Sequence, residues 1–230
     1  MVIDGIYYAL ALTAGGAVVW YFTQPLFAMP MFLLAAFCLY FFRDPERQIP
    51  AGPVAVSPAD GKVVAIRPDD AGGSRISIFL NIFDVHVNRT PVAGTVAGIQ
   101  YKKGQFLVAS KEQASHSNEQ NTITVDGVIQ NQPTRVMFKQ IAGLIARRVV
   151  SWKKQGDRVL RGERIGLVRF GSRVDVWLPK DAEILVKVGQ NVKGGSSVLA
   201  RWTGQAAIRS SAEARPAETD ANLTASGKRS

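Results

Sequence analysis

A long uncharged stretch near the N-terminus limits what this chain can fold into. No charged residue occurs from Gly5 to Phe42, and Gln24, Pro25 and Pro30 interrupt the apolar run near its middle. The two resulting segments, of about 17 to 18 residues each, are near the minimum length for a helix that spans a bilayer. The run therefore predicts a helical hairpin that anchors the chain in a membrane. A shallow re-entrant or interfacial anchor is the alternative interpretation.

The residues around this run indicate how it is used. Asp4 is the sole charged residue before it, so the basic region that begins a cleavable signal peptide is missing. Arg43 and Arg47 follow it directly, and the positive-inside rule then places the folded domain at the cytoplasmic face of a cell membrane. The single cysteine, Cys38, lies within the run, which excludes a disulfide framework.

The sequence changes character after the apolar run. From Val54 to Trp202, short β-branched stretches alternate with Gly, Pro, Asn and Asp, which predicts a β-rich domain rather than βαβ units. A polar stretch at 111–120 is the one helical candidate there. Beyond Gly204 the chain has almost no apolar residues, as is typical of a disordered tail. We expect three parts: a membrane-anchoring hairpin over 1–45, a β-rich domain over 46–203 and a disordered tail over 204–230.

Two short segments repeat one glycine pattern. The sequence G-D-R-V-L-R-G at 156–162 and the sequence G-Q-N-V-K-G-G at 189–195 carry glycines and a valine in register. This spacing places glycines where two strands turn tightly and a valine beneath the turn. It resembles the half-motifs of lipoyl and biotinyl carrier domains and predicts a barrel-sandwich-like fold. A fold of this kind assigns no function by itself.

The net charge of +10 is concentrated between residues 135 and 173. Nucleic acid and anionic lipid headgroups are the usual partners of such a basic segment. The uncharged N-terminal run, and the lack of aromatic residues interleaved with the basic ones, favour an anionic membrane surface over nucleic acid.

Four segments together resemble a known family. They are F-F-R-D-P-E-R at 41–47, S-P-A-D-G-K-V at 57–63, D-V-H-V-N-R-T-P at 84–91 and the Gly-Ser pair at 171–172. In order and spacing they resemble the phosphatidylserine decarboxylase proenzymes of the short, single-domain kind found in bacteria and archaea. The resemblance implies a carboxy-lyase that converts phosphatidylserine to phosphatidylethanolamine and carbon dioxide. It also implies self-cleavage into a large fragment, 1–171, and a small fragment, 172–230, that stay paired.

The residue types at the Gly171-Ser172 bond suit self-cleavage. A serine hydroxyl can attack the carbonyl of the preceding residue, and a glycine there permits the bent peptide that the attack requires. β-Elimination and loss of ammonia then convert Ser172 to a pyruvoyl group, an electron sink that forms a Schiff base with the substrate's amine. Taken alone, a Gly-Ser pair is more often a turn or a β-bulge.

Self-cleavage also requires a base, and the resemblance implies that Asp60, His86 and Ser172 form the self-cleavage group. Asp84 is a possible further carboxylate, because it and His86 are expected on one face of a strand, where a carboxylate would fix the imidazole tautomer. Each aspartate also has an ordinary interpretation. Asp60 precedes a glycine as in a type I′ turn, and Asp84 suits a turn before a strand.

His86 is also the candidate that returns a proton to the carbanion left when carbon dioxide departs. Longer members of the family carry a second histidine three residues further on, where this chain has Arg89. One histidine then serves both steps, or another group replaces it in one of them. His116, in a polar segment where the family has a substrate-covering loop, is interpreted as a solvated loop residue.

Other classes of site have weaker support. No His, Cys, Asp and Glu cluster has metal-ligand spacing and no glycine-rich phosphate loop follows a strand, so we expect neither a metal nor a nucleotide. The alternative function is that of a non-enzymatic, membrane-tethered barrel-sandwich carrier or adaptor. A carrier needs a lysine at the tip of its hairpin, and the residues at that place are 170–173, F-G-S-R. A homo-oligomer is left open.

Overall fold

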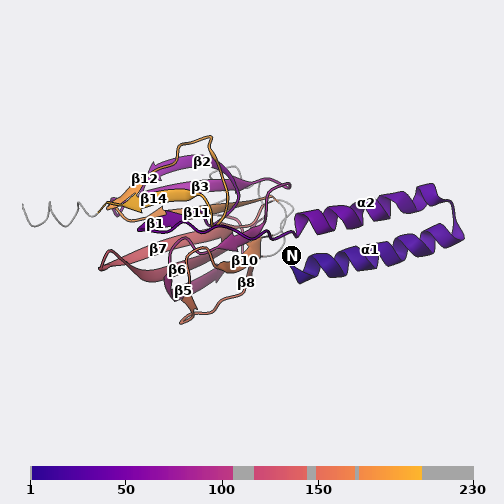
Figure 1. The fold of residues 1–230 in the computed structure, drawn as a ribbon, viewed down its shortest axis with the longest axis horizontal. Coiled ribbons are helices and arrows are strands. Elements are labelled where there is room, and N and C mark those ends of the chain that lie inside the picture. Colours follow the sequence, from indigo (N-terminus) through magenta and orange to yellow (C-terminus); the bar gives the residue numbers. More distant parts are fainter. Residues whose placement is uncertain (1, 106–116, 144–148, 169–170, 204–230) are drawn as a thin grey trace, which may run out of the picture.

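An apolar helical hairpin projects from one end of a β-domain (Figure 1). The computed structural model describes residues 2–105, 117–143, 149–168 and 171–203. Helix α1 (Ile3–Phe22) and helix α2 (Pro25–Phe41) run antiparallel and are joined by a short break. The predicted hairpin is therefore confirmed.

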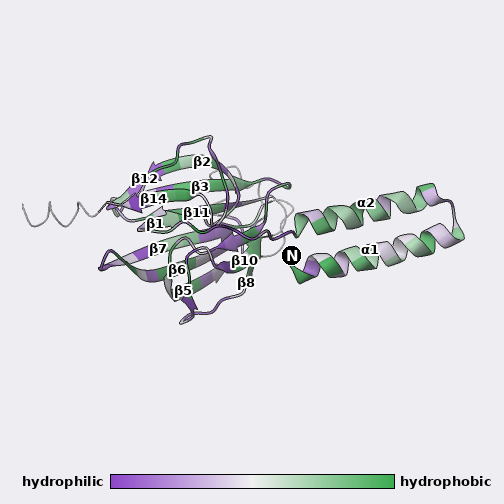
Figure 2. Cartoon of the chain, viewed as in Figure 1, coloured by the Kyte–Doolittle hydropathy of each residue, from purple (hydrophilic) through white to green (hydrophobic). Residues whose placement is uncertain are grey.

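Small residues bring the two helices together. A Cβ on Gly16 would lie 2.9 Å from Phe32 Cε1, and one on Gly15 would lie 2.6 Å from the Met31 methyl carbon. Close approach through glycines is common where helices pair inside a membrane. Apolar residues also run along both helices (Figure 2), and many of their side chains are exposed. Helix α1 is long and apolar enough to cross a membrane, whereas α2, at 17 residues, is shorter.

The described part of the β-domain forms three sheets. The largest has the strand order β13-β2-β3-β11-β7-β6-β5-β9, and the two smaller sheets have the orders β1-β14-β12 and β4-β10-β8. The mainly β prediction is confirmed. The strands are β1 (Val54–Val56), β2 (Gly61–Pro68), β3 (Ser74–Leu80), β4 (Val87–Arg89), β5 (Gly94–Lys102), β6 (Gln120–Ile129), β7 (Gln132–Ile141), β8 (Val149–Ser151), β9 (Arg158–Val159), β10 (Arg164–Val168), β11 (Ser172–Leu178), β12 (Ala182–Ile184), β13 (Asn191–Val192) and β14 (Val198–Trp202).

The domain consists of two similar halves. Strands β2 and β3 pair antiparallel with a bulge after Val63, and β5 and β6 pair in the same way with a bulge after Val96. The two glycine-pattern segments provide the edge strands of the large sheet, where Val192 faces Gly61 and Val159 faces Gly94. One half comprises β1–β3 with β11–β14, and the other comprises β4–β10. The halves meet where β7 pairs with β11.

Close backbone contact explains the glycine that begins each half's long ladder. A Cβ on Gly61 would lie 2.2 Å from the Phe79 carbonyl oxygen, and one on Gly94 would lie 2.2 Å from the Asp126 carbonyl oxygen. Both distances are far below van der Waals contact, so a larger residue would separate the strands. The valines opposite, Val192 and Val159, are buried in the core between the sheets.

Some charges of the basic segment are neutralised within the chain. Arg135 pairs with Asp126, Lys153 with Glu163, and Arg173 with Asp175. The segment is therefore not one uniform basic face over the described residues. Two exposed side chains, Lys154 and Arg158, are not in any of these ion pairs, and binding to an anionic membrane surface stays a prediction.

The structure departs from the predicted elements in one place. Asp84 and His86 lie in a turn and an extended connection rather than in a strand, because β4 begins only at Val87. Most of the helical candidate at 111–120 lies outside the described residues, and its last residue begins β6. The predicted tail also lies outside them, and the three-part division of the chain stays a prediction.

Candidate active site

One end of the β3–β11 ladder brings distant parts of the chain together. Leu80, the last residue of β3, pairs with Ser172, the first residue of β11. The chain leaves Leu80 through a turn at Asn81–Asp84 and reaches His86, whose carbonyl accepts a hydrogen bond from the Val168 amide at 3.3 Å. His86 and Ser172 therefore lie at the same end of the ladder, which is the end nearest the helical hairpin (Figure 1).

Gly171 and Ser172 have the local geometry that the sequence predicted. Gly171 has a φ of +54°, in the left-handed region that glycine adopts without strain, and no other atom crowds the position of a Cβ there. Glycine is therefore favoured at this position by backbone conformation. Ser172 is fully buried, and its Oγ has no hydrogen-bond partner among the described residues. A buried hydroxyl without a partner is costly, so its retention points to a chemical use.

The imidazole of His86 has a defined tautomer. Its Nδ1 lies 2.9 Å from the carbonyl oxygen of Asp84. Because a carbonyl can only accept, Nδ1 carries the proton, and Nε2 presents a lone pair. Nε2 is buried and has no hydrogen-bond partner. Burial lowers the pKa of His86 to about 4, so the side chain is neutral and able to accept a proton at pH 7.

The C-terminal end of helix α2 contacts this histidine directly. The ring centroids of Phe41 and His86 are 4.3 Å apart. Phe41 and Phe42 also pack with the apolar side chains on either side of His86, Val85 and Val87. The anchor thus contributes to the dry surroundings that lower the pKa of His86.

Neither predicted carboxylate bonds the imidazole. Asp84 Oδ2 accepts a hydrogen bond from the Asn81 amide at 2.8 Å, and burial raises the pKa of Asp84. Asp60 Oδ2 lies 2.8 Å from an Arg47 nitrogen, and its Oδ1 accepts from the Gly194 amide at 2.7 Å. The charge of Asp60 also raises the pKa of Asp84, so the two carboxylates are within electrostatic range. The Asp84 carbonyl, rather than a carboxylate, fixes the histidine tautomer.

Comparison with known proteins decides what kind of site this is. The sequence model of phosphatidylserine decarboxylase matches residues 34–200. The chain belongs to the phosphatidylserine decarboxylase family. A phosphatidylserine decarboxylase proenzyme of Solibacter usitatus is 63% identical over 201 residues, covering 87% of this chain and 96% of that protein. Proenzymes of the same name from Syntrophus aciditrophicus and Desulfotalea psychrophila are 49% and 47% identical, over 71% and 74% of this chain and 78% and 81% of theirs.

Ion pairs connect three of the four segments that carry the family resemblance. Arg89 lies 2.8 Å from Asp44, and both side chains are almost fully buried. Asp44 also pairs with Arg164, and Arg47 of the same segment pairs with Asp60. Arg89, which occupies the place of the second histidine of longer decarboxylases, therefore fastens the segment after the anchor to the β-domain. It is committed to an ion pair and is poorly suited to proton transfer.

The residue that follows Ser172 is charged. Here Arg173 is buried and donates to Asp175 at 2.6 Å and to Ser77 Oγ at 2.8 Å. Asp175 is fully buried as well. Removing one partner of such a pair leaves an uncompensated buried charge. The hydrogen bond from Arg173 to Ser77 links β11 to β3 close to Ser172.

A chain of buried amides near the site was missed by the sequence reasoning. Gln140 Nε2 donates to Asn88 Oδ1 at 2.8 Å, and Asn121 Nδ2 donates to Gln140 Oε1 at 3.1 Å. This arrangement leaves Asn88 Nδ2 as a buried donor without a partner and Asn121 Oδ1 as a buried acceptor without one. A usable signal was present in the sequence, because Asn121 and Gln140 lie on the same faces as the apolar residues Ile123 and Val125 of β6 and Val136 and Phe138 of β7.

The amide chain lies on the same face of the sheet as the serine. Gln140 faces Val174 across the β7–β11 ladder, and Val174 and Ser172 project to the same side of β11. Diagonal neighbours on one face are about 7 to 8 Å apart, within reach of a side chain. Asn88 meets Gln140 from the facing sheet and lies two residues after His86. The unpartnered atoms of Asn88, His86 and Ser172 are therefore all buried at the same end of the large sheet.

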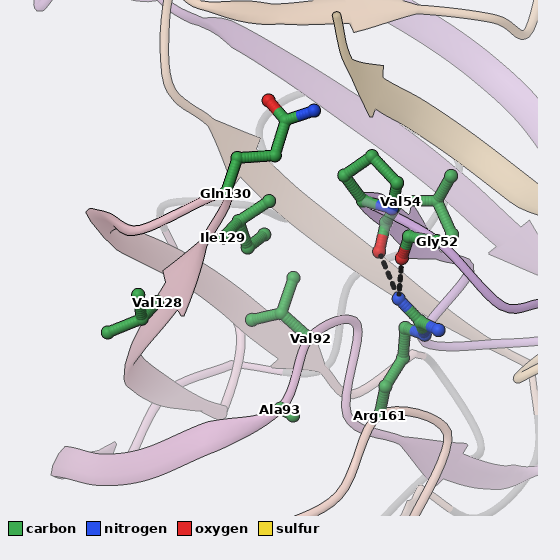
Figure 3. Close-up of a pocket in the computed structure, with 9 residues that line it drawn as sticks. Gly52, Val54, Val92, Ala93, Val128, Ile129, Gln130 and Arg161 are labelled. Carbon is green, nitrogen blue, oxygen red and sulfur yellow. Dashed lines mark hydrogen bonds between the residues drawn. The ribbon is translucent and has the colours of Figure 1, made fainter. Parts of the chain in front are cut away.

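A hollow of about 320 Å³ lies elsewhere, beside the β6–β7 turn (Figure 3). Its lining is mostly apolar, and Arg161, its one charged residue, donates to the carbonyls of Gly52 and Val54. Strand β6 begins beside the serine end of the sheet at Gln120 and ends at the hollow, so ten residues, about 30 Å of strand, separate the two. The hollow has no group suited to the family's chemistry.

The remaining predictions concern ligands and His116. Among the described residues, no group of three or more His, Cys, Asp and Glu side chains could hold a metal ion. His116 and Phe170 lie outside the described residues, so their roles stay predictions.

Proposed function

We propose that this chain is a self-processing proenzyme that decarboxylates phosphatidylserine to phosphatidylethanolamine and carbon dioxide, using a pyruvoyl group made from Ser172. The proposal combines the family membership with one structural observation. A buried serine hydroxyl without a partner follows a glycine in the left-handed conformation, at the same end of the sheet as a neutral histidine with a free Nε2. These are the nucleophile, the bent peptide and the base of an intramolecular acyl shift.

In the first step, Ser172 Oγ attacks the carbonyl carbon of Gly171. His86 Nε2 accepts the hydroxyl proton, and the C–N bond of the peptide breaks as that proton passes to the departing nitrogen. An ester now joins Gly171 to the Ser172 side chain. A neutral imidazole is needed for this step, and burial keeps His86 neutral down to about pH 4.

In the second step, a base removes the Cα proton of Ser172 and the ester C–O bond breaks. Gly171 leaves with a carboxylate, and position 172 becomes a dehydroalanine. Its imine tautomer takes up water and loses ammonia, which leaves the ketone of a pyruvoyl group. The Asp84 carbonyl accepts a hydrogen bond from His86 Nδ1 and so favours the imidazolium formed when the histidine takes a proton.

Asn88 is the donor that we assign to the oxyanion on Gly171 during the first step. Its amide orientation is fixed by Gln140, which leaves Nδ2 without a partner on the buried side. A preorganised donor in a site without water stabilises a developing negative charge far more than it would in water. The sequence provides no other family motif for this role, so the assignment depends on the amide chain.

The two fragments would remain one domain after cleavage. Strand β11 lies between β3 and β7, and all seven residues of β11 pair with β3. Strands β13 and β14 pair with β2 and β1 in the same way. Each of these ladders joins the small fragment to the large one, so cutting one peptide bond removes no sheet contact.

Decarboxylation needs a base and then an acid. A pyruvoyl ketone at position 172 would supply the electron sink for the pair released when carbon dioxide leaves. The amine of phosphatidylserine is protonated in solution and must lose a proton before it attacks a ketone. His86 Nε2 accepts that proton and later returns it to the substrate's Cα. One histidine therefore suffices for both steps, in agreement with the structural role of Arg89.

An intact-mass measurement of the purified protein tests the proposal. We expect two species instead of a single 25.0 kDa chain, cut between Gly171 and Ser172, with the small fragment blocked to Edman sequencing by its pyruvoyl end. Purified protein that is uncut and yet decarboxylates phosphatidylserine would contradict the mechanism.

A further inference from the structure

The turn between β3 and β4 exposes two apolar side chains beside the foot of the helical hairpin. Phe83 is 62% exposed and Ile82 is 39% exposed, although both precede a buried segment. Exposed apolar residues at a loop tip usually mark a surface that contacts another body. The turn connects Leu80, which pairs with Ser172, to His86, so any body that covers the turn lies at the edge of the active site.

The turn is rigid. Asn81 Oδ1 accepts from the Phe83 amide at 2.7 Å, and Asp84 Oδ2 accepts from the Asn81 amide at 2.8 Å. The Asp84 amide donates back to the Asn81 carbonyl at 3.0 Å. The two apolar side chains are therefore held outward by their own backbone, rather than exposed because the loop is loosely packed.

The hairpin holds the same turn. Arg43 donates to the Phe83 carbonyl at 2.6 Å and to the Tyr40 carbonyl at 2.9 Å, and the Tyr40 hydroxyl donates to the Phe83 carbonyl at 3.3 Å. The Arg43 guanidinium also lies 3.9 Å from the centre of the Tyr40 ring. A tyrosine and an arginine where an apolar helix ends are typical of the level of the lipid headgroups. The turn is fixed at that level.

We propose that Ile82 and Phe83 insert into the membrane interface as a second contact beside the hairpin, so that the active site opens onto the lipid headgroups. The occupant is a bilayer because the turn is continuous with the apolar surface of the hairpin through Tyr40 and Arg43. Two contacts, unlike one, also fix the orientation of the β-domain against the membrane. The inference deepens the proposed function, on which its consequence for the lipid substrate rests.

Probe depth tests the contact without relying on activity. In full-length protein with Cys38→Ala, Phe83→Cys is labelled with an environment-sensitive fluorophore and reconstituted into phosphatidylcholine and phosphatidylglycerol vesicles. The matched control is Val128→Cys, which is 69% exposed near the β6–β7 turn at the other end of the sheet. We expect blue-shifted emission and quenching by nitroxide-bearing lipids at 83, and water-like emission without quenching at 128. Equal, water-like behaviour at both positions would overturn the proposal.

The competing explanation is that a second copy of the chain, rather than a bilayer, covers the turn that carries Ile82 and Phe83. If the blue shift at position 83 appears in detergent without lipid and grows with protein concentration, the turn is a contact between copies and the proposal is wrong. If the shift requires vesicles and is unchanged when the protein is diluted among them, the lipid contact is supported.

Kinetics separate this inference from the proposed function. Phe83→Ser keeps the backbone carbonyl that Arg43 binds, so processing should be normal. We expect it to raise KM for phosphatidylserine in vesicles several-fold while leaving kcat/KM unchanged for a dissolved short-chain phosphatidylserine. Equal kinetics with vesicles would contradict the membrane contact, whereas inactivity of the wild-type protein on both substrates would contradict the proposed function alone.

Discussion

The two ends of the large sheet have related structures but different chemistry. Pro53 immediately precedes β1, and His86 has the equivalent position before β4. Ala93 immediately precedes the first glycine of β5, and Asp60 has the equivalent position before the first glycine of β2. Leu80 of β3 and Gly127 of β6 occupy equivalent positions in the two halves. Leu80 pairs with Ser172 on β11, and Gly127 pairs with Thr134 on β7. Pro53 and Ala93 both line the hollow of Figure 3. The hollow is thus the counterpart of the candidate active site, and it has none of the three residues predicted to react there.

The difference between the two ends follows from how the strands are connected. Strands β6 and β7 are joined by a two-residue turn, Gln130 and Asn131, with φ values of +50° and +62°. Their counterparts, β3 and β11, are not joined, because the entire second half of the domain lies between Leu80 and Ser172. The outgoing connection carries His86 and the incoming one carries Gly171. The two-residue β6–β7 turn has no room for either connection. The end where β3 and β11 are not joined can therefore hold His86 and Gly171.

The largest difference expected between the two ends concerns the serine. Ser172→Ala should give a full-length, inactive chain, because no other atom on that residue can attack the Gly171 carbonyl. Thr134→Ala, the matched change at the other end, should process and turn over normally. Denaturing gels and a carbon dioxide release assay measure both. Cleavage of Ser172→Ala at the same bond would remove the serine from the mechanism.

The second prediction concerns His86. His86→Ala should stay uncut if the histidine is the base for self-cleavage, or should cut normally and lose about 10²- to 10⁴-fold in turnover if it only delivers the proton to Cα. Asp60→Asn should show a milder form of the same defect, because it alters charge near the imidazole without removing it. Pro53→Ala is the control at the other end. If His86→Ala and Asp60→Asn both process and turn over at wild-type rates, His116 becomes the residue to test.

The third prediction tests the amide chain. Asn88→Leu has a similar size but no donor, so it should slow self-cleavage by about 10² to 10³-fold, the usual cost of one oxyanion donor. Ala55 holds the equivalent position on β1, and Ala55→Val serves as the packing control at the end of the sheet that has the hollow. The time course of cleavage in freshly translated protein is the measurement. If Asn88→Leu matches wild type, another group binds the oxyanion.

The smallest effect is a pH dependence of stability. The pKa of His86 is about 4 in the folded chain and near 6.5 when unfolded, so the unfolded chain alone binds this proton between those values. The free energy of unfolding should therefore fall as pH falls from 6.5 to 4, by about 3 kcal/mol from this residue, and should level off below.

Urea unfolding of the uncut Ser172→Ala chain in detergent measures this dependence. The same chain with His86→Gln is the control and should lack that part of the slope. Equal slopes in both chains would show that the histidine is not buried as neutral imidazole.

The sequence by itself determined the general class of fold and singled out the residues that we propose react. The uncharged run from Gly5 to Phe42 indicated a helical hairpin, because a chain without charges over that length is stable mainly where water is excluded. The residue types at Gly171 and Ser172 predicted the bent peptide that the φ of Gly171 shows. Alternating β-branched residues predicted the mainly β domain. Each of these signals is local, so it can be read along the chain.

Only the tertiary structure decided which groups meet. The insertion of one half of the domain into the other is a long-range pairing, and it brings His86 and Ser172 to the same end of the β3–β11 ladder although 85 positions lie between them. The sequence predicted that a carboxylate fixes the imidazole, but the Asp84 carbonyl does so because the chain turns before β4 begins. Asn88 and Gln140 become one unit only when two sheets face each other. Burial, which sets the pKa of His86, likewise arises from packing against the anchor.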